Sequence, residues 1–189
     1  LNGVATVTSV TPGCQNTIPG TITITGSGAI PPYTFYYSIN GVGTSSSTIG
    51  GSSAVTITVP NSSSGTYLYD INNLTYANAS FCLQAQTAQA TVSVNPEPLI
   101  QSSVNGLNCG PGSVTIGASS TAAAVNWYTS PTGGSPVYTG SIFTTPIINN
   151  STTYYAQAVS NQGCTSATRT PVDAIIEQTG IWKGFTNNW

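Results

Sequence analysis

The chain alternates hydrophobic and polar residues in short runs, which is the pattern of half-buried β-strands. In residues 21–25, Ile22 and Ile24 would face a core while the threonines between them face water. Four further runs in the first half cover residues 3–10, 33–39, 55–59 and 84–94. Sustained helical periodicity is missing from every segment, so the pattern predicts an all-β fold.

Glycine, proline and asparagine separate these runs about every ten residues, as turns do. Residues 26–32 contain too much glycine and proline for anything but a loop. Asn40-Gly41 is the strongest short hairpin signal and closes the run at residues 33–39. The region around Gly50-Gly51 reads as a glycine-serine loop. Seven or so short strands with regular turns predict a β-sandwich.

The second half repeats this plan after a joint in which Pro96 and Pro98 bracket Glu97. Strands are expected at residues 113–117, 125–128 and 167–176. Two prolines around one residue favour an extended, semi-rigid connection. The sequence therefore predicts two tandem domains at residues 1–95 and 99–178, with residues 96–98 as the linker.

Three aromatic residues are expected to have structural roles in these domains. Tyr67 follows a Ser-Ser-Gly-Thr turn and resembles the tyrosine corner of immunoglobulin-like sandwiches, where the hydroxyl bonds back to the preceding turn. Tyr154 occupies the corresponding place in the second half. Trp127 lies on a central strand, where a tryptophan is more often core than binding platform. These features predict two immunoglobulin-like β-sandwiches.

Residues 179–189 break the repeat and hold two of the three tryptophans. The segment is either a tail docked on the second domain or the start of a following module. We prefer the second reading, because a tryptophan-rich end would expose costly apolar surface.

Charged residues make up only 3% of the chain, against roughly 25% in ordinary soluble proteins. With a net charge of -2, the chain lacks the basic footprint of nucleic-acid binders. Hydrophobic residues reach 39% and fall in period-two runs, which argues against disorder. Solubility is therefore expected to come from hydroxyl and amide groups.

The four cysteines divide two and two between the halves: Cys14, Cys82, Cys109 and Cys164. No pair has CxxC spacing and histidine is absent, so a zinc site is not indicated. One structural disulfide in each domain, Cys14–Cys82 and Cys109–Cys164, is the simplest assignment. It implies an oxidising compartment outside the cytosol.

The sequence resembles a known pair of repeats over nearly its whole length. The motifs of the first half are Cys14-Gln15, Gly26-Ser27-Gly28, Pro32-Tyr33-Thr34-Phe35, Ile39-Asn40-Gly41 and Gly65-Thr66-Tyr67. They resemble an Ig/PKD-like repeat of very large surface adhesins and other type IX-secreted proteins of gliding bacteria. The motifs of the second half are Gly112-Ser113-Val114-Thr115, Asn126-Trp127-Tyr128, Pro131-Thr132-Gly133-Gly134, Phe143-Thr144-Thr145-Pro146, Thr153-Tyr154-Tyr155 and Gly163-Cys164-Thr165. They resemble the companion Ig-like repeat.

Trp182, Gly184 and Trp189 resemble the W-x-G start of the segment that often follows this pair. The resemblance implies tandem sandwiches on an extracellular, cell-surface stalk that is exported through the outer membrane. It implies no catalytic or binding residues.

Catalytic chemistry has few candidate residues. Without histidine, neither a Ser-His-Asp nor a Cys-His arrangement can form. The charged residues are Asp70, Glu97, Asp173, Glu177, Arg169 and Lys183. A calcium site that joins Glu97 to Asp173 or Glu177 is the weaker reading, and solvated surface charges are the stronger one. We expect no enzyme, no cofactor and no resident metal.

The sequence leaves three functions open. The first is a structural and adhesive module of a long bacterial surface protein, whose partners are neighbouring domains of the same chain or fibre. The second is a carbohydrate-binding accessory module that contacts surface glycans through an exposed tyrosine: Tyr36, Tyr76, Tyr128 or Tyr138. The third is a filament subunit that lends residues 181–189 as a strand to its neighbour. The chain shows no membrane-spanning run, and we favour the first function.

Overall fold

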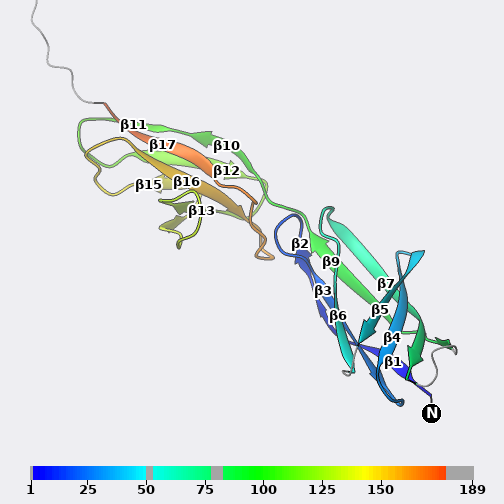
Figure 1. The fold of residues 1–189 in the computed structure, drawn as a ribbon. Helices are drawn as coiled ribbons and strands as arrows, with labels where there is room; N and C mark the ends of the chain where they lie inside the picture. The colour runs from blue at the N-terminus through cyan, green and yellow to red at the C-terminus, as the bar shows by residue number, and fades with distance from the viewer. Residues whose placement is uncertain (1, 50–52, 78–82, 178–189) are drawn as a thin grey trace, which may run out of the picture. The chain divides into compact units, whose positions relative to one another are not determined.

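The computed structural model describes residues 2–49, 53–77 and 83–177, and all regular elements in these ranges are β-strands (Figure 1). The chain divides into two compact units, Leu1–Glu97 and Pro98–Trp189. Each unit is a sandwich of two sheets, which confirms the predicted all-β fold with two tandem sandwiches. Residues 179–189 lie outside the described residues.

The first unit has a small and a large sheet. The small sheet has the order β1–β3–β6, with bounds Val4–Thr11, Thr21–Ser27 and Ala54–Thr58. The large sheet has the order β2–β9–β7–β4–β5, with bounds Gly13–Cys14, Gln89–Asn95, Gly65–Tyr76, Tyr33–Ile39 and Val42–Ile49. The short strand β8 (Gln84–Ala85) pairs with β7.

The second unit repeats the strand order of both sheets. Its small sheet has the order β10–β12–β15, with bounds Ile100–Val104, Thr115–Ser120 and Ile142–Thr144. Its large sheet has the order β11–β17–β16–β13–β14, with bounds Gly106–Cys109, Thr170–Glu177, Thr152–Val159, Ala124–Tyr128 and Tyr138–Thr139. The order of the small sheet and of the large sheet is therefore the same in both units.

The first strand of each unit is split into two pieces that join different sheets. In the first unit β1 pairs with β3, and β2 then pairs in parallel with the last strand β9. In the second unit β10 pairs with β12, and β11 pairs in parallel with the last strand β17. The segment that begins each unit therefore connects both sheets and lies against the segment that ends the unit.

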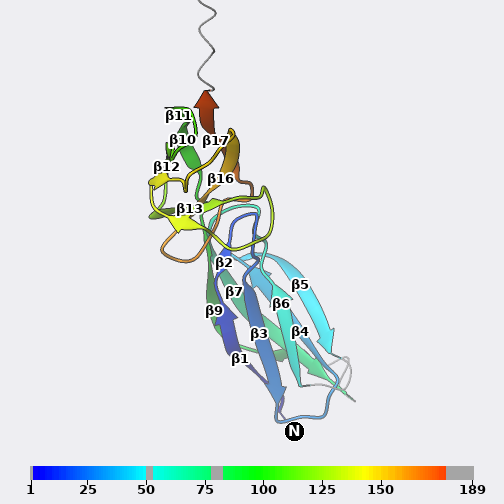
Figure 2. The same ribbon diagram turned by 90° about the vertical axis from the view of Figure 1, so that its left-hand side faces the viewer.

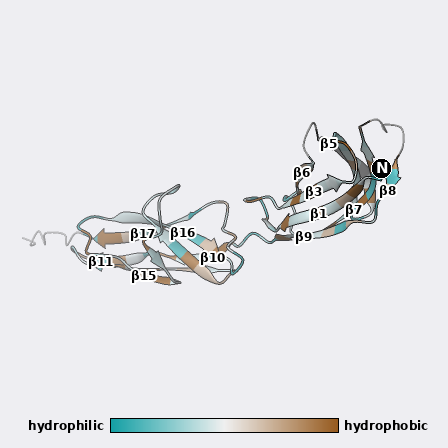
Figure 3. Cartoon of the chain, turned by 90° about the horizontal axis from the view of Figure 1, so that it is seen from below, coloured by the Kyte–Doolittle hydropathy of each residue, from teal (hydrophilic) through white to brown (hydrophobic). Residues whose placement is uncertain are grey.

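Alternation along the strands builds a separate core in each unit. In the first unit Ile22 and Ile24 are fully buried and pack with the aromatic ring of Phe35. In the second unit Val172 and Ala174 face the core from the last strand. Figure 3 shows hydrophobic and hydrophilic positions within the same strands, as two-sided strands require.

The outer face of the first unit's small sheet is coated with threonine hydroxyls. Thr8 and Thr25 lie 3.0 Å apart through their Oγ1 atoms, and Thr23 and Thr56 are joined in the same way at 3.0 Å. The strands β1, β3 and β6 that carry them are labelled in Figure 2. Cross-strand hydroxyl pairs stabilise the sheet and keep its surface polar without charge.

Two strands differ from the predictions. Residues 42–49, for which no strand was predicted, form β5 and pair with β4 in a hairpin. The loop predicted around Gly50-Gly51 lies outside the described residues. Asn40 and Gly41 both have positive φ, 51° and 73°, and this turn aligns the polar strand with its partner. The last strand of the first unit, expected at residues 84–94, is interrupted at residues 86–88 and forms β8 and β9.

Candidate functional site

Three of the acidic side chains hydrogen-bond to neutral neighbours. Asp70 Oδ1 accepts from Gln89 Nε2 at 2.5 Å, and Asp173 Oδ1 accepts from the Thr153 hydroxyl at 2.7 Å. Glu97 Oε2 accepts from Asn16 Nδ2 at 2.8 Å. Among the described residues no three His, Cys, Asp or Glu side chains gather into a metal site. The calcium site that would join Glu97 to a carboxylate of the second unit stays a hypothesis.

The predicted disulfide of the second domain is wrong. Cys109 is a free, exposed cysteine at the end of β11, whereas Cys164 is disulfide-bonded. Cys109 pairs in register with Glu177 at the end of β17, while Cys164 precedes the start of β17. An eight-residue strand spans about 23 Å at about 3.3 Å per residue, far beyond the Cα separation of about 7 Å that a disulfide tolerates. Cys109 and Cys164 therefore lie at opposite ends of one strand.

In the first domain Cys14 is disulfide-bonded, and it lies at the end of β2 beside Asn95. Its predicted partner Cys82 lies outside the described residues. The predicted plan of one disulfide in each domain is therefore wrong, because Cys109 is free while Cys14 and Cys164 are both bonded.

Cys109 should be the reactive thiol of the second unit. Iodoacetamide applied to the folded chain without reductant is expected to alkylate Cys109, because its side chain is exposed and unbonded. Peptide mapping by mass spectrometry should then find Cys14 and Cys164 unlabelled until a reductant is added. An unlabelled Cys109 in the absence of reductant would contradict the free thiol.

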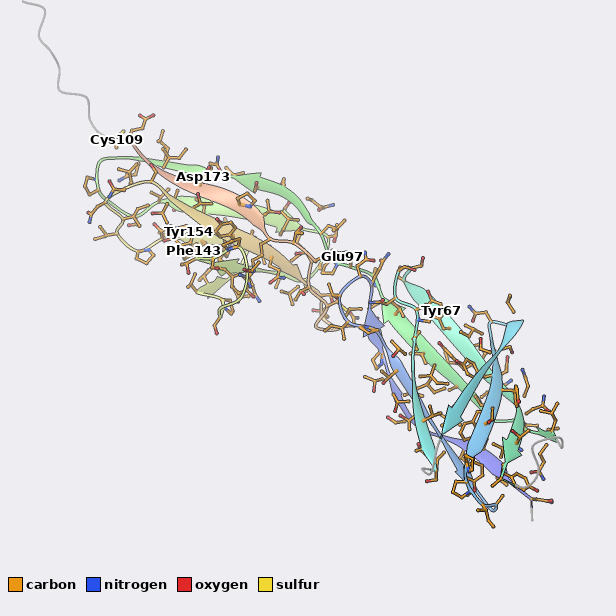
Figure 4. All side chains as sticks on the ribbon, in the orientation of Figure 1. Tyr67, Glu97, Cys109, Phe143, Tyr154 and Asp173 are labelled. Carbon is orange, nitrogen blue, oxygen red and sulfur yellow. The ribbon has the colours of Figure 1, made fainter. Side chains whose placement is uncertain are left out.

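Tyr67 bonds to the turn that precedes its strand. Its hydroxyl donates to the Ser63 carbonyl oxygen at 2.9 Å, four residues upstream. Ser63 belongs to the Ser-Ser-Gly-Thr turn that opens β7. The bond fixes the point where the chain enters the longest strand of the first unit (Figure 4).

Trp127 and Tyr154 lie in the core of the second unit. The Trp127 side chain is 0% exposed, and its Nε1 donates to the Gly140 carbonyl oxygen at 2.8 Å. The Tyr154 ring packs edge-on against Phe143 with centroids 5.2 Å apart, as their positions in Figure 4 also indicate. Burial of this kind makes Trp127 a structural residue that no surface ligand can reach.

Arg169 organises the turn that follows β13. Its guanidinium carbon lies 3.3 Å from the ring centroid of Tyr128, and its Nη1 donates to the carbonyl oxygens of Ser130 and Gly133 at 2.8 Å each. One arginine therefore covers an aromatic ring and ties a glycine-rich turn to the sheet. From the sequence alone, Arg169 was expected to be only a solvated surface charge.

The four tyrosines considered as binding platforms have different surroundings. Tyr128 is buried beneath Arg169, and Tyr76 packs against the core of the first unit. Tyr138 is 45% exposed and stacks on Phe143 at 5.3 Å. Tyr36 is partly exposed on the outer face of β4. Tyr138 is therefore the most exposed of the four, and Tyr36 and Tyr76 are half-buried.

Tyr69 has a buried hydroxyl that finds no hydrogen-bond partner among the described residues. Burial, followed by the neighbouring hydroxyls of Tyr37 and Tyr67, raises the pKa of Tyr69 to about 12 from the usual 10.0. The folded state therefore binds this proton more tightly than the unfolded state. Its contribution to stability is present below pH 10 and is lost as the pH rises from 10 toward 12.

Tyr69→Phe is expected to stabilise the first unit by about 1 kcal/mol, because it removes a polar group that is buried without a partner. The variant should also lose less stability than the parent chain between pH 10 and 12. Urea unfolding at a series of pH values measures both effects. A variant less stable than the parent at neutral pH would show that the hydroxyl has a partner.

An open cavity of about 220 Å³ lies in the first unit where β7 faces the interrupted last strand. Ile71 and Ala88, which also contact the core, form its apolar part. Asp70, Asn72, Thr87 and Gln89 supply its polar part. This cavity was not predicted from the sequence. Its one signal is the density of glutamines at Gln84, Gln86 and Gln89, which periodicity alone treats as an ordinary polar strand face.

One family model matches the second unit. Residues 98–177 match the family model described as an Ig-like domain, CHU_C associated. A search of curated proteins gives no match to the chain. The structure contains, among its described residues, no helix with the length and hydrophobicity needed to cross a membrane.

The chain is similar to several solved structures. The fibronectin(III)-like modules of Clostridium thermocellum CbhA are 15% identical, with 93% of this chain and 95% of that chain covered and a TM-score of 0.44. A C-terminal 282-residue intimin fragment, solved with the intimin-binding domain of its translocated receptor, is 12% identical, with coverage of 91% and 64% and a TM-score of 0.49. The BSP domain of a biofilm-associated protein is 12% identical, with coverage of 92% and 30% and a TM-score of 0.34.

At these identities and scores the three structures carry no information about what this chain binds. The family match and the repeated strand order are the stronger findings. The chain therefore consists of tandem Ig-like repeats, and the second of them matches the CHU_C-associated Ig-like domain family over residues 98–177.

Proposed function

We propose that the chain is a non-catalytic extracellular module, a segment of a long bacterial cell-surface adhesin or fibre that transmits tension along its backbone. The observation that carries this proposal is the parallel pairing of the opening and closing strands in both units. Residues 96–98 would act as the short linker between modules, and the partners would be neighbouring domains of the same chain or fibre.

The strand geometry gives this proposal a mechanical basis. In the second unit the ladder runs from Gly106↔Ala174 to Cys109↔Glu177, and Gly110 N donates to the Glu177 carbonyl oxygen at 2.8 Å. A force on the two ends of a unit pulls parallel terminal strands in opposite directions along their length. All the hydrogen bonds between them are then loaded together in shear, whereas a hairpin pulled at its open end loses its bonds one after another.

The surface and the cysteines agree with an extracellular setting. Disulfides persist in oxidising compartments, and Cys14 and Cys164 are disulfide-bonded. Threonine hydroxyls in place of charges coat the small sheet of the first unit.

Single-molecule force spectroscopy on the whole chain tests the proposal, with a reductant present so that disulfides do not limit extension. Two unfolding events are expected, each releasing about 300 Å of extended chain at about 3.4 Å per residue. Asn108→Pro should lower the force of one event, because alternate residues of β11 donate to β17 and proline removes the donor.

Asn108→Ala is the matched control, since it removes the same side chain and keeps the backbone donor. It should unfold at nearly the parent force. Equal unfolding forces for the proline and alanine variants, with both shown to be folded by circular dichroism, would contradict the mechanical proposal.

A carbohydrate-binding role is the second candidate, and the cavity beside β7 favours it. Strand donation by residues 181–189 has no such support, because the segment lies outside the described residues.

A further inference from the structure

The cavity in the first unit lies at a break in the pairing between β7 and the last strand. Asp70 and Gln89 form the last regular pair. Beyond it Ile71 N donates to the Ala88 carbonyl oxygen, and Gln86 N donates to the Asn72 carbonyl oxygen, at 2.9 Å each. Two residues of β7 therefore face three residues of the other strand, and Thr87 is the extra one. A bulge of this kind opens a sheet and redirects its side chains.

The polar side chains at this bulge keep unused hydrogen-bonding capacity. Asp70 uses Oδ1 to accept from Gln89 Nε2, and Asn72 Nδ2 donates to the Ser38 hydroxyl at 3.3 Å. Within the described residues these contacts leave Asp70 Oδ2, Gln89 Oε1 and Asn72 Oδ1 as acceptors. A ligand with several hydroxyl groups can donate to all three.

Gln86 supports the cavity from the core side. Its Oε1 accepts from Ala5 N at 2.8 Å, and its Nε2 donates to the Gly3 carbonyl oxygen at 3.2 Å. These bonds tie the bulged segment to the start of β1. The cavity is therefore anchored before any ligand arrives, which lowers the ordering cost of binding.

An aromatic ring lies beside these acceptors on the same outer face of the sheet. Tyr36 is in register with Asn73, and Ser38, two residues further along β4, is in register with Asp70. Residues two apart on a strand point to one face and lie about 7 Å apart. The partly exposed Tyr36 side chain is thus separated from the acceptors of Asp70, Asn72 and Gln89 by about the width of one sugar ring. Apolar rings beside a few convergent polar groups are typical of small-ligand sites.

The charges around the cavity restrict the ligand. Both basic residues of the chain, Arg169 and Lys183, are in the second half, so the first unit has no cationic side chain for phosphate, sulfate or carboxylate. Asp70 is the one carboxylate at the cavity, and calcium prefers several clustered acids. A neutral molecule rich in hydroxyl groups fits these constraints better than an anion or a metal ion.

We propose that this site binds a neutral glycan, with one sugar unit in the cavity against Asp70, Asn72 and Gln89 and the adjoining unit stacked on Tyr36. The inference goes beyond the mechanical role. The two have separate tests, because a chain that binds no glycan can still resist force through its terminal strands.

The test is an array of neutral gluco-, manno-, galacto- and xylo-oligosaccharides probed with the whole chain, followed by calorimetric titration of the bound sugars. Asp70→Ala and Tyr36→Ala are each expected to weaken binding at least tenfold. Tyr36→Phe keeps the ring and should bind like the parent chain.

Two control variants show whether any loss is local. Tyr138→Ala removes an accessible tyrosine ring of the second unit, and Thr91→Ala removes an exposed side chain further along β9. Both should leave affinity unchanged, and thermal unfolding should confirm that every variant is folded.

Several results would overturn the proposal. One is an array without any bound neutral sugar. Another is binding that survives Asp70→Ala and Tyr36→Ala, or that is lost with Tyr138→Ala. Calcium binding that depends on Asp70, without any glycan binding, would assign the cavity to a metal instead.

Discussion

Trp127→Ala is expected to remove about 3–5 kcal/mol from the free energy of unfolding of the second unit. The indole is fully buried, lies 5.8 Å from the Phe143 ring, and donates to the Gly140 carbonyl oxygen. Alanine leaves a large cavity between the sheets and an unpaired carbonyl group. Since the free energy of unfolding of a domain is typically only about 5–15 kcal/mol, this one change removes a large part of the second unit's stability.

Calorimetry and urea unfolding of the whole chain measure the loss. Tyr138→Ala is the control, because its ring stacks on the same Phe143 but is 45% exposed and should cost much less. The core of the first unit shares no residue with that of the second. The midpoint of the first unit's unfolding transition should therefore change little in the Trp127→Ala variant. If Trp127→Ala and Tyr138→Ala lowered the free energy of unfolding equally, the buried Trp127 side chain would not be the larger contributor to the stability of the second unit.

Arg169→Ala is expected to cost the second unit about 2 kcal/mol. The guanidinium donates to two carbonyl oxygens and covers the Tyr128 ring, and hydrogen bonds from charged groups are stronger than neutral ones. Solvent reaches part of this side chain, which keeps the estimate at the lower end. The glycine-rich turn at residues 130–134 should lose its attachment, and its amide hydrogens should exchange faster.

Arg169→Lys separates charge from geometry. Lysine keeps the positive charge but lacks the planar group that lies flat on an aromatic ring. It should recover less than half of the lost stability. Full recovery of the free energy of unfolding by Arg169→Lys would show that the positive charge alone stabilises the turn. Hydrogen exchange measured by mass spectrometry checks the same point, because the turn's amide hydrogens would then exchange as slowly as in the parent chain.

The sandwich architecture was predictable because solvation acts on each residue separately. Ile22 and Ile24 alternate with threonines, and the structure buries both isoleucines completely while the hydroxyls pair outside. The Asn40-Gly41 turn was also predictable from the sequence, since few residue pairs adopt two successive positive φ values.

The strand β5 was not predictable from its own residues. It is rich in serine, threonine and glycine, which are typical of loops. The hairpin turn before it aligns its backbone with β4, and the ladder supplies the stability that its side chains lack. Pairing with a partner strand therefore overrides local composition in this segment.

The predicted disulfide of the second domain was wrong because the spacing of two cysteines along the sequence does not give their distance across a sandwich. Cys109 and Cys164 flank the same strand from opposite ends, which only the parallel register of β11 with β17 reveals. The cavity beside β7 could not be predicted for a related reason. It depends on one extra residue, Thr87, in an otherwise regular pairing, and no hydropathy pattern marks a bulge.

The split opening strand has a consequence for how genes encoding such chains can change. Because β2 and β9 run in the same direction, the polypeptide comes into the first sandwich at one pole and leaves it at the opposite pole, and β11 with β17 does the same in the second. In-frame duplication of one module then adds a whole sandwich without making the chain double back. Recombination between repeats can then change the number of modules without requiring any new fold.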